Sequence, residues 1–445
     1  MMYNYSNIKF IKESNRFLHN LNEDYGCFIV WEVARSYKER IRNLLSLNFE
    51  ILFETEIEWS SRNFHNNASR LYEDPLYDST SKSDRISGYG TKIGHNVFTL
   101  FVIKDYKPNY SYAVSTSKII ELSNLNVMSL KKEFREWVYN DLGVEYAVHA
   151  TDNIYEFFVQ GPLLLGVDLF KSLLNGNKPT IKRICKDLEG ADGWSSWTQV
   201  FEILNLSSNY LLLKNYESIP FEYQGKDIVL LTDNYQRLAS ALGVLQSSTN
   251  SFRGLIQIEN KQIPITMMFV GDKFYCTPWQ KDMLNNKIFR NDVFVLPDNM
   301  YFFSLLYYCK VRKNKIKEEH RKVLNSIAKR LNFTWYNKHT IFDNVAIGKI
   351  LWGYFKAKNY YYENPIDNKA FINKKIICYL PDRHSIILKD PMNPRKNVIK
   401  KMLRAILPER VYLYIHKVIW RLKFSVFNSF SLIMWLEDEF LISVY

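Results

Sequence analysis

The segment Gly26–Glu58, GCFIVWEVARSYKERIRNLLSLNFEILFETEIE, contains the pattern that decides the fold class. An apolar run, CFIVWEV, precedes a stretch with helical spacing, SYKERIRNLLSLN, and a second apolar run, FEILFETEIE, follows. Short apolar runs favour strands, whereas apolar residues that recur every three to four positions favour a helix. The segment therefore predicts a strand, a helix and a strand, and with them a mixed α/β (α+β) class.

The same kind of alternation continues along the chain. A helix is expected near 60–73, a strand over 96–106, a basic segment at 130–137 and a strand that ends at VHATDN before another helix. A second strand-rich block begins near Asn209 with YLLLKNYE and DIVLLTDN, passes through a hairpin over 256–276 and becomes helical after 300. We therefore predict an N-terminal extension (1–25), a first domain (26–186), a linker (187–208), a second domain (209–345) and a helical, basic C-terminal region (346–445).

Composition restricts the class of partner and the compartment. The 445 residues carry a formal net charge of +13, which attracts phosphates, nucleic acid or anionic lipid. The five cysteines are scattered singly, so neither a disulfide framework nor a zinc site is indicated. The N-terminus lacks the apolar stretch of a signal peptide, and no apolar segment is long enough to cross a bilayer. We expect a cytoplasmic protein.

The tail from Asn393 alternates lysine and arginine with bulky apolar residues. Two interpretations stay open: a peripheral contact with the inner face of the membrane, or a basic helix pair packed on the protein with solvated lysines. No helix-turn-helix, zinc-finger or aromatic RNA-binding pattern is visible, which argues against nucleic acid as the partner.

His149 ends an apolar run in VEYAVHATDNIYEF and is the first candidate site residue. A histidine here is either a hydrogen-bonded core residue or a phosphoryl acceptor, because neutral imidazole is nucleophilic near pH 7. The element order from Gly26 to Phe157 resembles that of the nucleoside diphosphate kinase family. In that family a strand-end histidine before Gly-Ser-Asp carries the phosphoryl group, and His149 precedes Ala150, Thr151 and Asp152.

This resemblance implies a ferredoxin-like, kinase-type first domain in which His149 is catalytic. It also implies nucleotide or phosphate contacts from Thr151 and from the basic segment with Lys131, Lys132 and Arg135, which is similar to the family's phosphate-contacting loop. The alternative for that segment is a solvated helix face. The family's Lys-Pro-Asp after the first strand is replaced by Trp31-Glu32-Val33, so the phosphate-orienting lysine is missing.

The block from Asn209 to Lys317 resembles a polysaccharide-associated nucleotidyltransferase family, which has a mixed sheet. An Asp-x-Asp pair on one strand and a third acid on a neighbouring strand hold its metal ions. Asp227 matches the first acid, but Val229 and Thr266 stand at the other two positions. The resemblance implies a catalytic and metal role for Asp227 in an incomplete site, where magnesium would lose most of its ligands.

Two functions follow as expectations. One is a nucleotide- or phosphosugar-binding protein related to phosphoryl and nucleotidyl transferases, in surface polysaccharide or envelope assembly. The other is a catalytically inactive pseudoenzyme that acts as a protein-interaction scaffold.

Overall fold

The first sheet has five strands in the order β7-β1-β4-β2-β8. Every neighbouring pair is antiparallel except β2 and β8, which are parallel. The computed structural model describes residues 22–73, 76–77, 93–114, 120–223, 225, 227–246, 252–313, 316–367 and 369–382. The strands are β1 (Asp24–Val30), β2 (Glu50–Glu58), β4 (Val97–Asp105), β7 (Val148–Ala150) and β8 (Arg183–Cys185).

Helices cover both faces of this sheet, which explains why β1 is buried along its whole length. The predicted strand-helix-strand start is confirmed: a 3₁₀ turn, η2 (Glu32–Tyr37), leads into α2 (Lys38–Asn48), which precedes β2. Alternate residues of β1 point to opposite faces. Phe28 packs in one core with Phe134 of α5 (Leu125–Leu142), whereas Ile29 packs in another with Phe157 of α6 (Ile154–Leu165).

The second sheet has eight strands in the order β14-β15-β9-β10-β13-β12-β11-β3. Its centre consists of β10 and β13, which are parallel, with antiparallel β9 beside β10 and antiparallel β12 beside β13. The bounds are β3 (Leu76–Tyr77), β9 (Tyr210–Lys214), β10 (Ile228–Thr232), β11 (Leu245–Gln246), β12 (Arg253–Ile258), β13 (Lys261–Phe269), β14 (Ile288–Arg290) and β15 (Val293–Val295).

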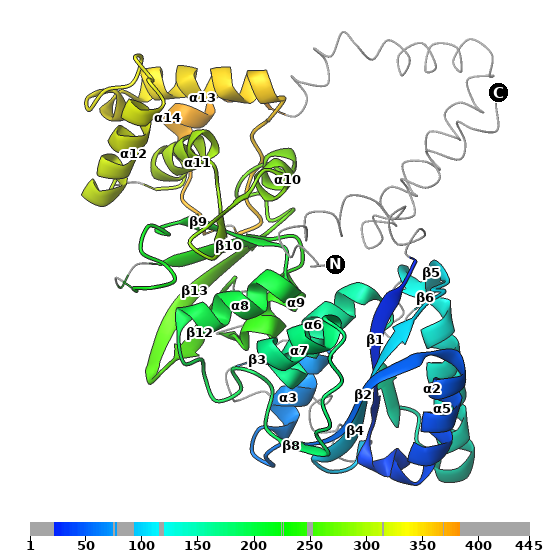
Figure 1. Cartoon of the computed structure of the whole chain (residues 1–445). Coiled ribbons are helices and arrows are strands. Elements are labelled where there is room, and N and C mark those ends of the chain that lie inside the picture. Colours follow the sequence, from blue (N-terminus) through cyan, green and yellow to red (C-terminus); the bar gives the residue numbers. More distant parts are fainter. Residues whose placement is uncertain are drawn as a thin grey trace, which may run out of the picture. The chain divides into compact units, whose positions relative to one another are not determined.

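A layer of helices lies between the two sheets (Figure 1). On the side of the first sheet α6 packs on β1, and on the side of the second sheet α9 packs on β13. In the middle α6 contacts α8, and α3 contacts α9. The other members of this layer are α3 (Phe64–Leu71), α7 (Val167–Leu174), α8 (Trp197–Ser207) and α9 (Tyr235–Leu242).

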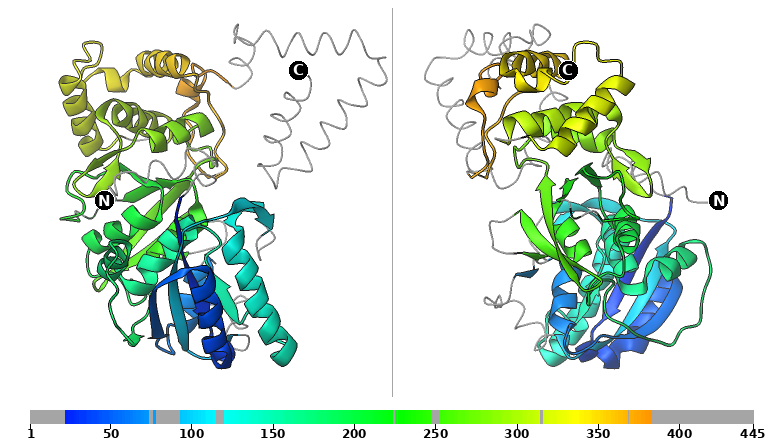
Figure 2. Two further views of the ribbon diagram at one scale, coloured as in Figure 1. Left: turned by 45° about the vertical axis from the view of Figure 1, so that its right-hand side comes forward. Right: turned by 90° about the vertical axis from the view of Figure 1, so that its left-hand side faces the viewer.

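The helices from α10 onward, coloured green to orange, gather at one end of the second sheet (Figures 1 and 2). They are α10 (Thr277–Asn285), α11 (Asp298–Val311), α12 (Glu318–Arg330), η3 (Thr340–Phe342), α13 (Asn344–Lys358) and α14 (Lys374–Ile377). A separate hairpin of β5 (Tyr110–Val114) and β6 (Ile120–Asn124) precedes α5.

The segment 187–208, which was predicted as a linker, is packed against the rest of the protein. Trp194 is buried, its indole Nε1 donates a hydrogen bond to the carbonyl oxygen of Leu242 at 2.9 Å, and residues from Trp197 onward form helix α8. The main hydrophobic core is continuous from the first sheet to the second, and the described residues up to Pro381 belong to one compact unit. The two halves are therefore not joined by a free connection.

Two other predicted boundaries fall inside elements of the structure. The extension predicted to end at residue 25 overlaps β1, which begins at Asp24. The boundary at 345/346 falls inside α13, which packs on α11. The basic tail beyond Asp382 lies outside the described residues.

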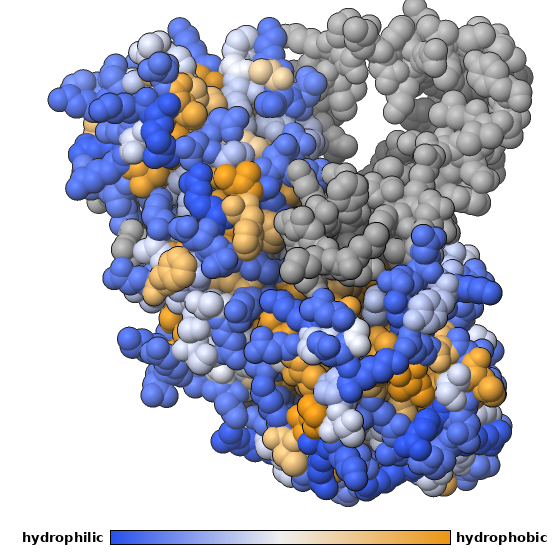
Figure 3. All heavy atoms as spheres, in the orientation of Figure 1, coloured by the Kyte–Doolittle hydropathy of each residue, from blue (hydrophilic) through white to orange (hydrophobic). Residues whose placement is uncertain are grey.

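Within the described ranges, no helix has both the length and the apolar character needed to cross a bilayer. The face shown in Figure 3 is mostly hydrophilic, with hydrophobic residues in small groups.

Candidate functional site

His149, the predicted phosphoacceptor, lies on β7 and faces the helix layer between the sheets. Its Nε2 lies 2.8 Å from Oε1 of Gln160 on α6, and its ring packs edge-on against Tyr72, with the centroids 5.0 Å apart. Burial lowers the pKa of His149 to about 3, and the positive charge of Lys131 acts in the same direction. The imidazole is therefore neutral at pH 7, but with 6% of the residue exposed it is enclosed.

We expect no acid-labile phosphate on the chain after incubation with γ-labelled ATP or GTP. Transfer to imidazole needs a phosphoryl group in line with a ring nitrogen, and the packing around His149 leaves no approach for a nucleotide. The measurement is protein-bound label before and after acid treatment, with wild type beside His149→Ala. Acid-labile label on wild type that is absent from His149→Ala would contradict this expectation.

Thr151 extends the pairing of β7 with β1. Its Oγ1 accepts a hydrogen bond from the backbone nitrogen of Cys27 at 3.0 Å, and its own backbone nitrogen donates to the carbonyl oxygen of Cys27 at 3.1 Å. The residue is buried. Its hydroxyl therefore has a structural use, as the acceptor for the backbone of β1.

Lys131 and Arg135 lie one turn apart in helix α5, not in a loop. Nζ of Lys131 donates to the carbonyl oxygen of Ala150 at 3.1 Å, and Nε of Arg135 donates to that of Val148 at 2.7 Å. These two carbonyls belong to β7, the edge strand of the first sheet. Both cations therefore satisfy backbone acceptors that the neighbouring strand does not use.

The three predicted phosphate-binding cations nevertheless share one open cavity of about 650 Å³ along α5. Lys132 is exposed and forms an ion pair with Glu136 at 3.7 Å. The pocket thus contains carboxylates as well as cations. It is lined by Ala113, Leu125, Met128, Ser129, Lys131, Lys132, Arg135, Glu136, Tyr139 and Glu145.

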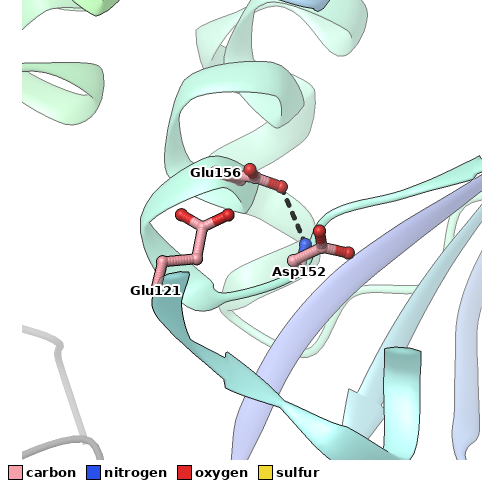
Figure 4. A group of neighbouring side chains, drawn as sticks. All are labelled: Glu121, Asp152 and Glu156. Carbon is pink, nitrogen blue, oxygen red and sulfur yellow. Dashed lines mark hydrogen bonds between the residues drawn. The ribbon is translucent and has the colours of Figure 1, made fainter. Parts of the chain in front are cut away.

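Three carboxylates meet near the start of α6: Glu121 of β6, Asp152 and Glu156 (Figure 4). Glu156 accepts a hydrogen bond from the backbone nitrogen of Asp152 at 2.7 Å, and the carboxylate of Asp152 is bound by Lys131 at 2.6 Å. Burial, together with the charge of Asp152, raises the pKa of Glu156 to about 8. The ammonium group of Lys131 and a proton held by Glu156 below about pH 8 thus balance much of the negative charge.

A row of four paired residues crosses the second sheet from β9 to β12, and we call it the transverse row. Lys214 pairs with Val229, Val229 with Thr266, and Thr266 with Arg253. Residues that pair across neighbouring strands direct their side chains to the same face of a sheet. The two positions that lack the metal-binding acids therefore lie side by side, between two cations.

Lys214 is buried, and its ammonium group lies between a carboxylate and a phenol. Nζ lies 3.7 Å from Oδ2 of Asp227 and 3.2 Å from the hydroxyl oxygen of Tyr308, which α11 contributes. Burial lowers the pKa of Lys214, and the charge of Asp227 opposes this effect. The side chain of Asp227 is 64% exposed, so the carboxylate is solvated while the ammonium is not.

Further cations lie near Lys214 and Tyr308. Nζ of Lys313 lies 5.4 Å from the ring centre of Tyr308. Burial raises the pKa of the Tyr308 hydroxyl, and the positive charge of Arg253 opposes this rise. The positive charges of Lys313 and Lys317 both lower the pKa of Lys214. Close positive charges raise the electrostatic potential and favour an anionic ligand. The surroundings of Tyr308 thus combine one carboxylate, Asp227, with four cations, Lys214, Arg253, Lys313 and Lys317.

Metal ligands are scarce beside the transverse row. In the described part of the chain, the group of Glu121, Asp152 and Glu156 is the one set of three or more side chains with the spacing of a metal site. Asp227 is not in it. Valine has no ligand atom and threonine offers a neutral hydroxyl, so the row does not fit magnesium.

In comparisons with protein-family models, with curated proteins and with solved structures, no significant match to this chain is found. The function of the transverse row is therefore inferred from its own side chains.

Sequence reasoning did not single out Lys214 or Arg253. A signal for Lys214 is present, because it ends the apolar run YLLLK, and a charge on a buried strand needs a partner. Arg253 carries no such signal. It joins the row only through the register of the β12–β13 hairpin, which pairs it with Thr266.

Proposed function

We propose that this chain is a nucleotide- or phosphosugar-binding protein related to phosphoryl and nucleotidyl transferases, and that it binds the ligand's phosphates at the transverse row without a metal ion. The observation that carries the proposal is the position of Val229 and Thr266 between Lys214 and Arg253. Side-chain cations there substitute for part of the charge that divalent ions supply to a triphosphate. The phosphosugar class and a place in surface polysaccharide or envelope assembly come from the resemblance alone.

The register of the second sheet supports a nucleotidyltransferase-type domain. Asp227 directly precedes β10 and lies two residues before Val229, the spacing that directs side chains to one face of a strand. Thr266 pairs with Val229 on the parallel strand β13. This register agrees with the arrangement of an Asp-x-Asp pair and a third acid, of which this chain keeps Asp227 alone.

The topology of the first sheet supports a ferredoxin-like domain. Six elements follow in the chain order β1, α2, β2, β4, α5 and β7, with η2, α3, β3 and the β5–β6 hairpin inserted among them. Their strands lie in the order β7-β1-β4-β2 with antiparallel neighbours. Both helices cover the same face. This order and these directions agree with the split β-α-β arrangement that the resemblance implies. We assign ligand binding to the second sheet, because the cations that gather there include the exposed Arg253, Lys313 and Lys317.

Isothermal titration with nucleoside triphosphates and nucleotide sugars tests the proposal. We expect equal affinity in EDTA and in magnesium. The double variant Val229→Asp/Thr266→Asp should instead bind more tightly in magnesium than in EDTA. The added carboxylates repel the triphosphate in EDTA, and with Asp227 they complete a magnesium site. Binding then becomes dependent on magnesium by about tenfold or more, since a charged contact contributes at least about 1.4 kcal/mol.

Thr266→Val is the matched control, because it changes the same position without adding charge. It should bind as wild type does in both buffers. The proposal fails if no nucleotide or nucleotide sugar binds, or if EDTA abolishes binding to wild type.

An exposed apolar face on α13 favours the second candidate, a pseudoenzyme scaffold. Val345 and Trp352 lie seven residues apart on one side of this helix, and 47% and 44% of their surfaces are exposed. A protein partner that binds with unit stoichiometry, is lost in Trp352→Ala and is indifferent to nucleotide would support this function instead.

A further inference from the structure

Arg70 of α3 is a buried cation with an incomplete set of partners. Its Nε donates to the carbonyl oxygen of Ser240 at 2.9 Å, and its Nη2 donates to those of Glu189 and Ala241 at 2.8 and 3.0 Å. The residue is 1% exposed, and Nη1 has no hydrogen-bond partner. A guanidinium has five N–H donors, so two of them are unpaired in the interior.

The charge of Arg70 is only partly balanced. Two of its carbonyl partners end α9, where the helix dipole supplies partial negative charge. The negative charge of Glu189 favours the charged form of Arg70 and raises its pKa. This carboxylate is itself hydrogen-bonded to Lys186 and Gln199. Burial lowers the pKa of Arg70 to about 10, so the guanidinium is still charged at neutral pH. A buried charge of this kind normally has an anionic partner.

A cavity of about 100 Å³ lies against this guanidinium. Its other lining residues include Asn66, Gln257 and Gln262, which are exposed, so the cavity leads from surface amides to a buried cation. Gly243 also lines it, and a Cβ there would lie 3.2 Å from Cζ of Arg70. The volume equals that of about three water molecules at roughly 30 Å³ each. It suits a small anion and is too small for a nucleotide.

We propose that this cavity is a binding site for a small anion of carboxylate or inorganic-phosphate size, held by Nη1 of Arg70. The site lies where α3, the segment before Trp194 and the end of α9 meet, since Arg70 is part of α3 and donates hydrogen bonds to the other two. The bound anion neutralises the guanidinium and stabilises this junction. The site is separate from the transverse row and does not depend on the proposed function.

Thermal unfolding of the full chain tests this site. The probes are sodium acetate, sodium phosphate and sodium chloride, each compared at equal ionic strength with sodium gluconate, whose anion is too large for the cavity. We expect a saturable rise of roughly 2 °C in the Tm of wild type with at least one small anion. A response to acetate alone assigns a carboxylate ligand, and a response to phosphate alone assigns a phosphoryl ligand.

Two variants locate the response. Arg70→Met should lose the anion-dependent rise. Arg312→Met should keep it, because Arg312 is likewise buried, donates to backbone oxygens and has an unpaired Nη1, but does not line the cavity.

If Arg70→Met does not fold, Ala191→Leu decides, because it fills the cavity while it leaves Arg70 in place. Loss of the rise in Ala191→Leu supports the site. A rise that persists in Arg70→Met or in Ala191→Leu, or the absence of a saturable rise in wild type, overturns it.

Discussion

Lys214→Met is expected to weaken the binding of a nucleoside triphosphate by about 10- to 100-fold, since hydrogen bonds to charged groups contribute roughly 1.5–3 kcal/mol. Methionine keeps the length of the buried side chain and removes its charge. The partner carboxylate of Asp227 is mostly exposed, so water solvates it once the ammonium is gone. The loss should therefore appear in affinity more than in folding.

Titration calorimetry of Lys214→Met beside Lys287→Met measures this effect. Lys287 is also buried near the start of β9, where it donates to Asn209 Oδ1 at 2.7 Å and to the carbonyl oxygen of Tyr210 at 3.1 Å. It is not in the transverse row, so its loss removes a buried charge without removing the ligand contact. Equal affinity losses in both variants would mean that the row does not bind the phosphates.

Glu156→Gln is expected to raise the Tm by about 5 °C at pH 8.5 and to leave it almost unchanged at pH 4.5. Burial raises the pKa of this carboxyl from 4.5 to about 8. A group whose pKa is raised in the folded state contributes stability that is fully present below pH 4.5 and is lost as the pH rises through about 8. Glutamine stays neutral and keeps the acceptor for the backbone nitrogen of Asp152, so the variant avoids this loss.

The informative window is pH 6.5 to 8.5. Burial raises the pKa of Asp24 and of Asp272 to about 6 each, so these groups change stability in the same direction but mostly at lower pH. Glu136→Gln is the control, since this residue is exposed and its ion pair with Lys132 is weak. Parallel Tm curves for wild type and Glu156→Gln across this window would show that Glu156 is ionised in the folded protein.

The strands and helices of Gly26–Glu58 were predictable because their pattern is local. The contacts of the site were not. Lys214 meets Tyr308 across 94 positions of sequence, and Arg253 joins the transverse row only through strand register. No periodicity in a single sequence specifies such pairs.

The packing of the segment predicted as a linker has a physical cause. The run DLEGADGWSSW has the glycine, aspartate and serine content of a loop, and loops normally lie at the surface. The two tryptophans of this run draw it into the interior, because the burial of such large side chains outweighs the loop-like composition around them. Trp194 and Trp197 are both buried, and they fix this segment between the two sheets.

The two α5 cations that cover β7 also affect how copies of this chain meet. An edge strand with unpaired carbonyls is a template on which another chain can add a strand and begin to aggregate. Along Val148–Ala150 the outward carbonyls are taken by Lys131 and Arg135. The two cations that were predicted to bind phosphate thus block strand addition at the β7 edge. Because these contacts are intramolecular, they oppose self-association at any protein concentration.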